Sequence, residues 1–397
     1  MLLKGNEALA LAAIRYGVDA YYGYPITPQS EIMETLIAQK PWESTGMTVL
    51  QAESEVAAIN MVYGTAATGR MAMTSSSGPG ISLMQNGISY LCGANLPCLI
   101  VNVMRGGPGL GTISPSQADY FQATRGGGHG DYRTLVLAPS SVQEMADFVA
   151  IAFQWAFRYR NPAMILADGT IGQMMEKVTL PPFQQRLTAS EVAKLHTWAS
   201  TGRREGQQRN IVSSLDLDPA AMELKCLNRE QRYQVAIDND ARHQAIHCDA
   251  AEILIVAFGS AARICTKTIQ LARQQGIRAG LFRPITLWPF PAQALRQAAQ
   301  HAQHILVVEL NAGQMIDDVR LALTTQNNPT QTPNLPNTSN HPNTPTITHY
   351  GRLGGVVFTP EEILNHIKNI HTAPSTQTTP PTQTTTPTQT APSTPPH

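Results

Sequence analysis

A regular alternation of short apolar runs with helical stretches, from the N-terminus to about residue 178, most constrains the fold of this sequence. Short apolar runs between turn signals are typical of buried strands, and the segments between them are long enough for helices. Strands that alternate with helices predict a parallel sheet with helices on both faces. The predicted strands are Ala20–Tyr24, Met47–Leu50, Met71–Ser75, Cys98–Val103, Thr134–Leu137 and Ala163–Leu166. The predicted helices are Glu7–Tyr16, Glu55–Thr68, Ile81–Leu91 and Val142–Arg158.

A second, smaller α/β pattern begins near Glu252. A predicted helix lies between its first two strands and ends at Gln275. The predicted strands are Ile253–Ala257, Ala279–Phe282 and Ile305–Glu309. This pattern predicts a second α/β domain built on a small parallel sheet.

The segment between the two patterns, residues 179–250, is polar and has few strand signals. We interpret it as a connector that is partly helical. The sequence therefore predicts an N-terminal domain at 1–178 and a small C-terminal domain at 251–371. Two segments rich in Asn, Pro, Thr and Gln can bury little apolar surface, so we expect a disordered insertion and a disordered tail. These segments are Thr324–Thr348 and Thr372–His397.

The composition excludes several classes of function. Lys and Arg together number 28, as do Asp and Glu, and no basic run stands out, so nucleic acid and anionic membranes are poor candidate partners. Neither a signal peptide nor the ~20 consecutive apolar residues of a membrane helix is visible, and we expect a cytoplasmic protein. The five cysteines form no C-x2-C pair, which indicates buried thiols rather than ligands of an iron–sulfur cluster.

Several common site motifs are absent. The glycine clusters Gly106–Gly111 and Gly126–Gly130 do not fit G-x-G-x-x-G, and no glycine precedes a Lys-Ser or Lys-Thr pair as in a Walker A motif. Neither His-Glu-x-x-His nor Gly-x-Ser-x-Gly occurs. His243, His247 and Cys248 have a spacing that metal ligands use on a helix, but a solvated face of the connector is the favoured interpretation. We predict no metal site within this chain.

The first candidate site segment is GYPITP at residues 23–28, directly after a predicted strand. Its two prolines fix φ on either side of Thr27, which makes the loop rigid. Open α/β sheets bind their ligands at the carboxyl ends of their strands. An ordinary connection to a helix, with Thr27 or Ser30 as the N-cap, is an equally good interpretation of this pattern alone.

The second candidate segment is QAESEVAAIN at residues 51–60. Glu55 begins a predicted helix of mostly small and apolar residues, and a carboxylate in such surroundings can share or donate a proton. Taken alone, the pattern favours a simpler interpretation, in which Glu55 only stabilises the positive end of the helix dipole.

The third candidate segment is MRGGPG at residues 104–109, which places Arg105 at the end of a buried strand and inside a glycine-rich loop. A guanidinium group there is well placed to bind a carboxylate. The alternative is a structural arginine bound to backbone carbonyls. The loop SGPG at residues 77–80 precedes a predicted helix, so Ser77 and Gly78 are candidate amide donors to an anion.

Taken together, these segments resemble a known family. The motifs GYPITP, QAESEVAAINMVYG, SSSGPGISL, MRGGPGLG, PSQADYFQA and GGGHGDYR, in that order, resemble the alpha subunit of the 2-oxoacid:ferredoxin oxidoreductases. FGSAARI, RPITLWPFP and VVELNAGQ resemble the second domain of that subunit, which is similar to the transketolase C-terminal domain. The resemblance covers about residues 1–323 and resumes at Gly351–Ile363. MRGGPGLG followed by PSQADYFQA is most similar to the branched-chain enzymes, which act on 3-methyl-2-oxobutanoate.

The resemblance implies a fold and a reaction. The fold has two parallel-sheet α/β domains, a thiamine diphosphate pyrimidine-binding domain followed by a transketolase C-terminal-like domain. In the reaction, a 2-oxoacid loses carbon dioxide, its acyl group passes to coenzyme A, and electrons pass one at a time to ferredoxin. The protein tunes the cofactor, which carries the difficult chemistry.

Specific residues of this chain match the family's motifs. Glu55 matches the glutamate that hydrogen-bonds N1′ of the cofactor's aminopyrimidine ring and so promotes loss of the C2 proton. Thr27 and Arg105 match positions associated with the carboxylate and keto group of the substrate. The candidate catalytic residues are therefore Glu55, Arg105 and Thr27. The candidate cofactor-binding residues are Glu55, Pro25 and Ile26, and the candidate substrate-binding residues are Thr27, Arg105, Ser77 and Gly78.

The chain lacks the Gly-Asp-Gly motif with a following Asn pair that usually holds magnesium and diphosphate. Asp168-Gly169 has no leading glycine, and Asn327-Asn328 lies in low-complexity sequence. The resemblance implies that a beta subunit carries this motif, so that thiamine diphosphate and Mg²⁺ bind at the interface of two chains. Iron–sulfur clusters are expected only on the partner subunits, the ferredoxin-like gamma and delta chains. We therefore expect an obligate hetero-oligomer.

Three alternatives stay open at this point. The same enzyme class can act on 2-oxoglutarate, pyruvate or an aryl pyruvate, because residues of a partner chain also line the substrate pocket. A non-catalytic scaffold subunit with the same fold is a second alternative, although the joint presence of Glu55, Thr27 and Arg105 argues against it. A self-sufficient transketolase-like enzyme is disfavoured by the missing diphosphate motif.

Overall fold

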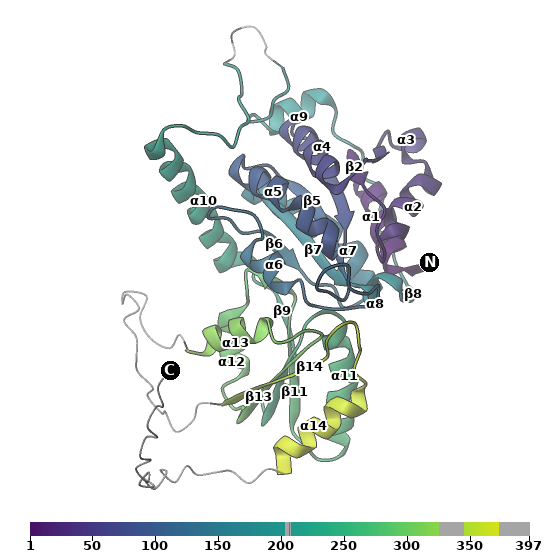
Figure 1. The fold of residues 1–397 in the computed structure, drawn as a ribbon, viewed down its shortest axis with the longest axis vertical. Helices are drawn as coiled ribbons and strands as arrows, with labels where there is room; N and C mark the ends of the chain where they lie inside the picture. The colour runs from purple at the N-terminus through teal and green to yellow at the C-terminus, as the bar shows by residue number, and fades with distance from the viewer. Residues whose placement is uncertain (203–205, 207, 325–344, 373–397) are drawn as a thin grey trace, which may run out of the picture.

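Two α/β units lie one above the other in the protein, with the N-terminal unit at the top of Figure 1. The computed structural model describes residues 1–202, 206, 208–324 and 345–372. Each unit contains a largely parallel sheet with helices packed against it. The predicted α/β class with two parallel-sheet units is thereby confirmed.

The N-terminal sheet has seven strands in the order β12-β6-β7-β5-β4-β2-β3. Only the pair of β12 with β6 is antiparallel. Every residue of the central strands β5 and β7 is buried, which requires helices on both faces. The strands are β2 (Ala20–Gly23), β3 (Thr48–Gln51), β4 (Ala72–Ser76), β5 (Cys98–Met104), β6 (Leu135–Leu137), β7 (Pro162–Asp168) and β12 (Thr286–Trp288).

Two sets of helices supply these faces. Apolar residues of α1, α2 and α7 form one core with the sheet, and those of α4 and α5 form another. The long helix α10 runs down the side of this unit toward the second one (Figure 1). The bounds are α1 (Gly5–Tyr16), α2 (Ser30–Gln39), α3 (Pro41–Ser44), α4 (Glu55–Ala67), α5 (Gly78–Gly93), α6 (Tyr120–Arg125), α7 (Val142–Tyr159), α8 (Gly169–Gln173), α9 (Ala189–Leu195) and α10 (Pro219–Asp240). A small antiparallel pair is formed by β1 (Leu2–Lys4) and β8 (Met175–Lys177).

The C-terminal sheet has five strands in the order β14-β13-β10-β11-β9, of which only β9 runs antiparallel. Helices α11 and α14 cover one face, where their apolar residues join those of the strands in one core. The strands are β9 (His243–Ile246), β10 (Ile253–Val256), β11 (Ala279–Pro284), β13 (His304–Glu309) and β14 (Thr346–Gly351). The helices are α11 (Gly259–Gln274), α12 (Ala292–Ala298), α13 (Met315–Thr324) and α14 (Pro360–Thr372).

Three strands correct the boundaries expected from the sequence. β9 lies within the predicted connector, yet it pairs with β11 and belongs to the C-terminal sheet. β12 lies within the predicted C-terminal domain, yet it pairs with β6 in the N-terminal sheet. Residues 346–348, predicted to be part of the disordered insertion, pair with β13 as the start of β14. Residues 325–344 of that insertion and nearly all of the predicted tail lie outside the described residues.

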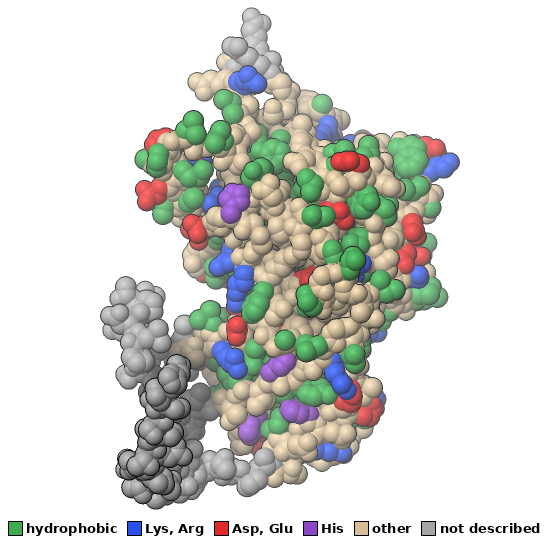
Figure 2. Space-filling model, in the orientation of Figure 1, with side chains coloured by type: hydrophobic (Ala, Val, Ile, Leu, Met, Phe, Trp, Pro, Cys, Tyr) green, Lys and Arg blue, Asp and Glu red, His purple; other side chains and the backbone are tan. Residues whose placement is uncertain are grey.

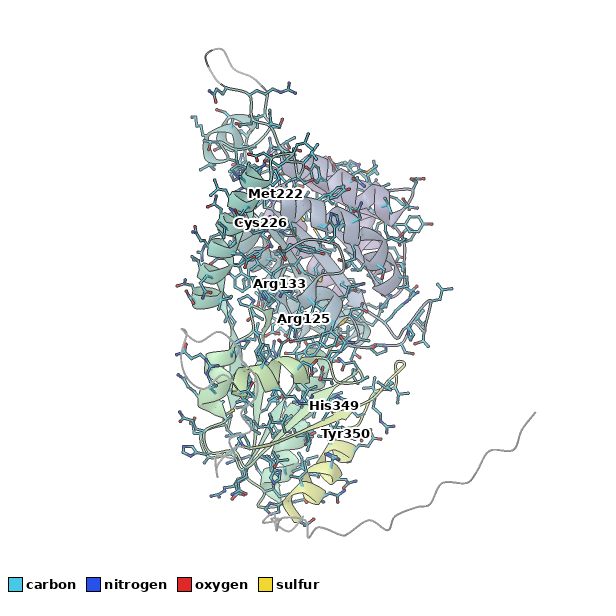
Figure 3. All side chains as sticks on the ribbon, turned by 60° about the vertical axis from the view of Figure 1, so that its left-hand side comes forward. Arg125, Arg133, Met222, Cys226, His349 and Tyr350 are labelled. Atoms are coloured by element: carbon cyan, nitrogen blue, oxygen red, sulfur yellow. The ribbon has the colours of Figure 1, made fainter. Side chains whose placement is uncertain are left out.

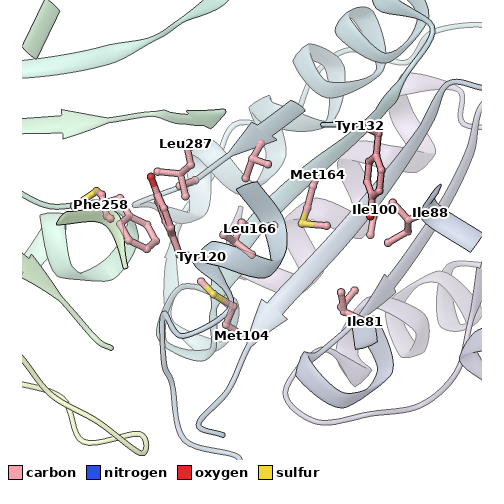
Figure 4. Close-up of a cluster of buried hydrophobic side chains, with 14 of the residues drawn as sticks. Ile81, Ile88, Ile100, Met104, Tyr120, Tyr132, Met164, Leu166, Phe258 and Leu287 are labelled. Carbon is pink, nitrogen blue, oxygen red and sulfur yellow. The ribbon is translucent and has the colours of Figure 1, made fainter. Parts of the chain in front are cut away.

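One hydrophobic core extends across both units. Met104 and Tyr120 of the N-terminal unit lie in the same buried cluster as Phe258 and Leu287, which come from the C-terminal part of the chain (Figure 4). The ring centroids of Tyr120 and Phe258 are 5.6 Å apart. This apolar surface stays buried only when the two units keep the same relative position, so its burial holds the units together.

Among the described residues, no helix is long and apolar enough to cross a membrane, and no three His, Cys, Asp or Glu side chains gather as metal ligands would. The residues considered as metal ligands have other contacts. The ring of His243 stacks on Phe282 at 5.1 Å, and the Cys248 thiol donates to the Leu281 carbonyl at 3.3 Å.

We expect Phe258→Ala to lower the free energy of unfolding by about 3–5 kcal/mol, because it leaves a cavity where the two units meet. Chemical denaturation of the isolated chain measures this change. Phe183→Ala is the matched control, because Phe183 is 65% exposed, and it should cost less than about 1 kcal/mol. Equal losses in the two variants would contradict a shared core.

Candidate functional site

The carboxyl ends of four parallel strands meet at one edge of the N-terminal sheet. β2 ends at Gly23, β4 at Ser76, β5 at Met104 and β7 at Asp168, and these strands are neighbours in the sheet. The loops expected to form the site follow β2, β4 and β5, so they begin side by side. This is the edge at which open α/β sheets bind ligands.

Polar side chains fix the loop after β2 through hydrogen bonds to its backbone carbonyls. Asn6 donates a hydrogen bond through Nδ2 to the Pro28 carbonyl at 2.8 Å, and Gln173 donates through Nε2 to the same oxygen at 3.1 Å. Gln29, which is fully buried, donates to the Tyr24 carbonyl at 3.1 Å. The loop is therefore fixed by contacts on its inner side.

The outer side of this loop is available to a ligand. Pro25 and Thr27 are exposed, and Ile26 is partly buried. The alternative role of Thr27 or Ser30 as an N-cap is wrong, because Gln29 occupies the N-cap position of α2 without a side-chain cap bond.

Arg105 connects this loop to the glycine-rich loop after β5. Its Nη1 donates to the Thr27 carbonyl and its Nη2 to the Leu110 carbonyl, both at 3.0 Å. The structural interpretation, an arginine bound to backbone carbonyls, therefore holds for these two nitrogens. Its buried Nε has no hydrogen-bond partner within the described part of the chain, so this N–H is left for a ligand.

Glu55 is the first residue of α4 and is only 6% exposed. Ser54 caps the helix, since its Oγ accepts from the Ala57 amide at 3.2 Å, so the Glu55 side chain is not needed for capping. Across the described residues, its carboxylate accepts no hydrogen bond and forms no ion pair. Both carboxylate oxygens are therefore free to accept a hydrogen bond from a ligand.

Gly80 leaves the space in which the Glu55 carboxylate lies. A Cβ atom at position 80 would be 2.6 Å from Glu55 Oε1 and 2.1 Å from Ser76 Oγ. The structure thus brings Glu55 from α4 against the start of α5, close to the predicted loop that contains Ser77 and Gly78.

Further buried polar atoms without partners lie at the ends of β4 and β5. In the described chain, the hydroxyl groups of Ser76 and Ser77 and Oδ1 of Asn102 make no hydrogen bond. Ser77 occupies the N-cap position of α5, yet its side chain does not cap the helix. Because buried polar groups are nearly always paired in native proteins, such a cluster indicates a place where a ligand binds.

Asp119 is a site residue to which the sequence analysis assigned no role. Its Oδ2 accepts from Asn102 Nδ2 at 3.0 Å and would be 3.8 Å from a Cβ atom at Gly78. Burial raises the pKa of the Asp119 carboxyl, while the hydrogen bond from Asn102 and the charge of Arg105 oppose the rise. Its position directly before α6 gives the signal of an N-cap, but the side chain makes no cap bond.

Asp168, considered above as part of a diphosphate motif, has a structural role. Its Oδ1 accepts from the amides of Thr170 and Ile171 at 3.0 and 3.2 Å, and its Oδ2 accepts from the amide of Ser260 at 3.2 Å. Burial raises the pKa of this carboxyl against those hydrogen bonds. Both oxygens are engaged in capping α8 and in joining the two units.

The candidate residues do not line the cavity beside α10. A cavity of about 620 Å³ lies beside α10, lined by Met222, Cys226 and the loop from His129 to Tyr132. Figure 3 shows Met222 and Cys226 along α10, with Arg125 and Arg133 below them.

Models of two protein families match this chain. The model described as pyruvate flavodoxin/ferredoxin oxidoreductase, thiamine diphosphate-binding, matches residues 11–213, and that of the pyruvate:ferredoxin oxidoreductase core domain II matches residues 251–363. The ketoisovalerate oxidoreductase subunit VorB of Methanothermobacter thermautotrophicus is 47% identical over 321 residues, or 81% of this chain and 89% of that protein. The chain belongs to the 2-oxoacid:ferredoxin oxidoreductases. The resemblance inferred from the motifs is thereby confirmed.

Other relatives in this family carry different substrate names. The 2-oxoglutarate synthase subunit KorA of Archaeoglobus fulgidus is 37% identical over 321 residues, or 80% of this chain and 90% of that protein. A solved 2-oxoglutarate:ferredoxin oxidoreductase from Magnetococcus marinus, with 2-oxoglutarate, coenzyme A and succinyl-CoA bound, is 25% identical with a TM-score of 0.77. The match covers 93% of this chain but 65% of that longer one.

The fold is also shared with a more distant protein. A split-gene transketolase has a TM-score of 0.57 at 13% identity, over 92% of this chain and 97% of the other. At this identity the likeness concerns the fold alone.

We expect Gly80→Ala to displace the Glu55 carboxylate, because the added methyl group would overlap Ser76 Oγ and Glu55 Oε1. In the isolated chain this should cost about 1–3 kcal/mol of stability, as overpacked sites do. Gly64→Ala is the matched control, since no atom lies within 4 Å of the added methyl group. It should be neutral or stabilising by up to about 1 kcal/mol, as measured by denaturation. A neutral Gly80→Ala would contradict the described packing of Glu55.

Proposed function

We propose that this chain is a catalytic subunit of a cytoplasmic oxidoreductase that acts on 3-methyl-2-oxobutanoate. In the proposed reaction, the 2-oxoacid, coenzyme A and two oxidised ferredoxins give an acyl-CoA, carbon dioxide, a proton and two reduced ferredoxins. The observation that carries the proposal is Glu55, whose side chain packs against Gly80 and whose carboxylate has no hydrogen-bond partner in the described chain. A carboxylate placed in this way can hold a hydrogen bond to a ring nitrogen and pass a proton to or from it.

The residues around Glu55 fit thiamine diphosphate. The missing side chain at Gly80 leaves room for the Glu55 carboxylate itself, and the Ser76 and Ser77 hydroxyl groups are without partners in the described chain. When bound, thiamine diphosphate supplies an electron sink for the charge left by departing carbon dioxide. Glu55 would hold a hydrogen bond to N1′ of the aminopyrimidine ring, with Pro25 and Ile26 beside it.

Arg105 and Thr27 are the proposed contacts for the substrate's carboxylate and keto group. The unpaired Nε of Arg105 and the exposed Thr27 side chain lie on the same edge of the sheet as Glu55. Ser77 and Gly78 begin the neighbouring helix α5 and would add donors there. The guanidinium is already oriented by two backbone carbonyls, which lowers the entropy lost when it binds an anion.

The surroundings of Arg105 favour an apolar substrate side chain. Leu110, whose carbonyl binds Arg105, is 81% exposed, and Ile113 in the same loop is 65% exposed. Apolar side chains beside a carboxylate-binding arginine suit a branched aliphatic 2-oxoacid better than 2-oxoglutarate, which has a second charge, or pyruvate, which has only a methyl group. The VorB relative, named for ketoisovalerate, supports the same choice.

A partner chain would complete the site over α4 and α5. Apart from Glu55 these two helices carry no charged residue, and their outer faces expose Val56, Met61, Leu83 and Tyr90. Figure 2 shows hydrophobic side chains at the surface where Figure 1 draws α4 and α5. An exposed apolar face without charge is typical of a protein interface.

We infer that the beta subunit binds this face, because Glu55 lies at its edge and the chain has no diphosphate motif of its own. The beta subunit would bring the diphosphate site and Mg²⁺. Iron–sulfur clusters would reside on ferredoxin-like gamma and delta subunits, which pass electrons to ferredoxin. A non-catalytic scaffold subunit is the competing function, and the next experiment separates the two.

We expect Glu55→Gln to lower kcat of the assembled complex by about a hundredfold or more, the usual effect of removing a general acid–base group. The measurement is reduction of a viologen dye with coenzyme A and 3-methyl-2-oxobutanoate, 2-oxoglutarate or pyruvate as substrate. In parallel, NMR follows deuterium exchange at C2 of thiamine diphosphate, which should slow by a similar factor.

Glu53→Gln is the matched control, since Glu53 is exposed and its carboxylate accepts only a 3.4 Å bond from Ser54 Oγ. It should leave both rates unchanged. Full activity of Glu55→Gln would support the scaffold role instead, and a preference for 2-oxoglutarate or pyruvate would overturn the proposed substrate.

We expect Leu83→Lys to weaken binding of the partner chain by about tenfold or more, because a charge placed in an apolar interface must be desolvated. Leu83 is 55% exposed and lies on α5. Leu217→Lys is the control, since Leu217 is 87% exposed in the connector before α10. Analytical ultracentrifugation of the co-expressed chains measures the affinity, and equal affinity of the two variants would exclude this face as the interface.

A further inference from the structure

The C-terminal unit clamps the short segment 116–121 of the N-terminal unit. Gln117 donates through its amide to the Leu310 carbonyl at 2.9 Å, and the Leu310 amide donates back to Gln117 Oε1 at 3.1 Å. Asn311 Nδ2 donates to the Gln117 carbonyl at 2.8 Å, and Ser116 Oγ donates to the Leu310 carbonyl at 3.2 Å. The segment is thus held by hydrogen bonds to Leu310 and Asn311, the two residues that follow β13.

Gln314 and Asp318 of the C-terminal unit bind the residues on both sides of Asp119 in the sequence. Gln314 Nε2 donates to the Ala118 carbonyl at 2.7 Å, and Gln314 Oε1 accepts from the Phe121 amide at 2.8 Å. Tyr120 donates through its hydroxyl to Asp318 Oδ2 at 2.5 Å. Both neighbours of Asp119 are therefore bound by side chains of the C-terminal unit, Ala118 by Gln314 directly before α13 and Tyr120 by Asp318 within it.

A buried carboxylate anchors the element that provides this clamp. Glu309 is fully buried and accepts from the amides of Met315 and Ile316 at 2.7 and 3.2 Å, at the N-terminus of α13. It also accepts from Asn311 Nδ2 at 3.0 Å. Hydrogen bonds of this kind fix a helix N-terminus, so Asn311 and Gln314 have defined positions.

Asp119 itself makes none of these contacts to the C-terminal unit. Its carboxylate turns back to the carboxyl edge of the N-terminal sheet, where it binds Asn102 and approaches Gly78. Arg105 acts on it electrostatically. The cluster formed by Asp119, Asn102 and Arg105 retains two buried unpaired atoms within the described chain, Asn102 Oδ1 and Arg105 Nε.

We propose that Asp119 is a positioning residue of the substrate site, which holds Asn102 for the 2-oxoacid, and that the C-terminal unit sets substrate affinity through it. This inference rests on the proposed function. The other buried acids nearby do not compete for the role, because Glu309 caps α13 and Asp318 binds Tyr120 and Arg125. A capping role for Asp119 is excluded by the absence of a cap bond in α6.

The test compares Asp119→Ala, Asp119→Asn and Gln314→Ala in the co-expressed complex, with Asp317→Asn as the matched control. Asp317 lies on the outer face of α13 and pairs only with Arg320 at 3.6 Å. The readouts are kcat and KM for 3-methyl-2-oxobutanoate, deuterium exchange at C2 of thiamine diphosphate, and the melting temperature.

Asp119→Ala should raise KM by about tenfold or more, as expected for loss of a hydrogen bond to a charged group, while kcat changes by less than about threefold. Exchange at C2 should stay unchanged, since it depends on Glu55. Asp119→Asn and Gln314→Ala should raise KM in the same direction but less, and Asp317→Asn should match the wild type. These two milder variants keep the test decisive if Asp119→Ala does not fold.

An unchanged KM in the folded Asp119 variants, with normal turnover and exchange, would overturn this inference and leave the proposed function intact. Parallel loss of kcat and C2 exchange in those variants would also overturn it, since that would indicate a general disruption of the site. A wild-type complex that neither exchanges the C2 proton nor reduces the dye would instead refute the proposed function.

Discussion

The parallel pairing of β2, β4, β5 and β7 is the constraint on which the candidate site depends. Because these strands run in the same direction, the loops that follow them emerge at one edge, and residues far apart in sequence become neighbours. Burial of β5 and β7 between two layers of helices keeps this edge rigid. Arg105 then joins the loop after β2 to the loop after β5, because it donates to one backbone carbonyl in each loop.

The C-terminal unit contributes to the site although it provides none of the candidate catalytic residues. Its β12 extends the N-terminal sheet, its Phe258 shares a core with Tyr120, and its Gln314, directly before α13, holds the segment that carries Asp119. These contacts depend on one another, because each requires the same relative position of the two units. The second unit therefore acts as a scaffold for the proposed substrate site.

The main strands and the site loops could be predicted from the sequence because buried strands are continuous apolar runs and the loops contain prolines or glycines. The edge strands β9, β12 and β14 escaped prediction. They have only three to six residues each. β9 and β14 are exposed or partly buried, and β12 pairs across the unit boundary, so these strands carry little apolar signal. Asp119 could not be assigned because its role depends on Asn102 and Gln314, which only the folded chain brings near it.

A structure of this chain bound to its partner chain, with thiamine diphosphate and the 2-oxoacid, tests the central claim most directly. The account predicts that a Glu55 carboxylate oxygen lies about 2.6–3.2 Å from N1′ of the aminopyrimidine ring, a hydrogen-bond distance. It also predicts that the partner covers α4 and α5, with the substrate carboxylate at Arg105. A cofactor ring whose N1′ contacts a residue of the partner chain, or that lies away from this edge, would contradict the account.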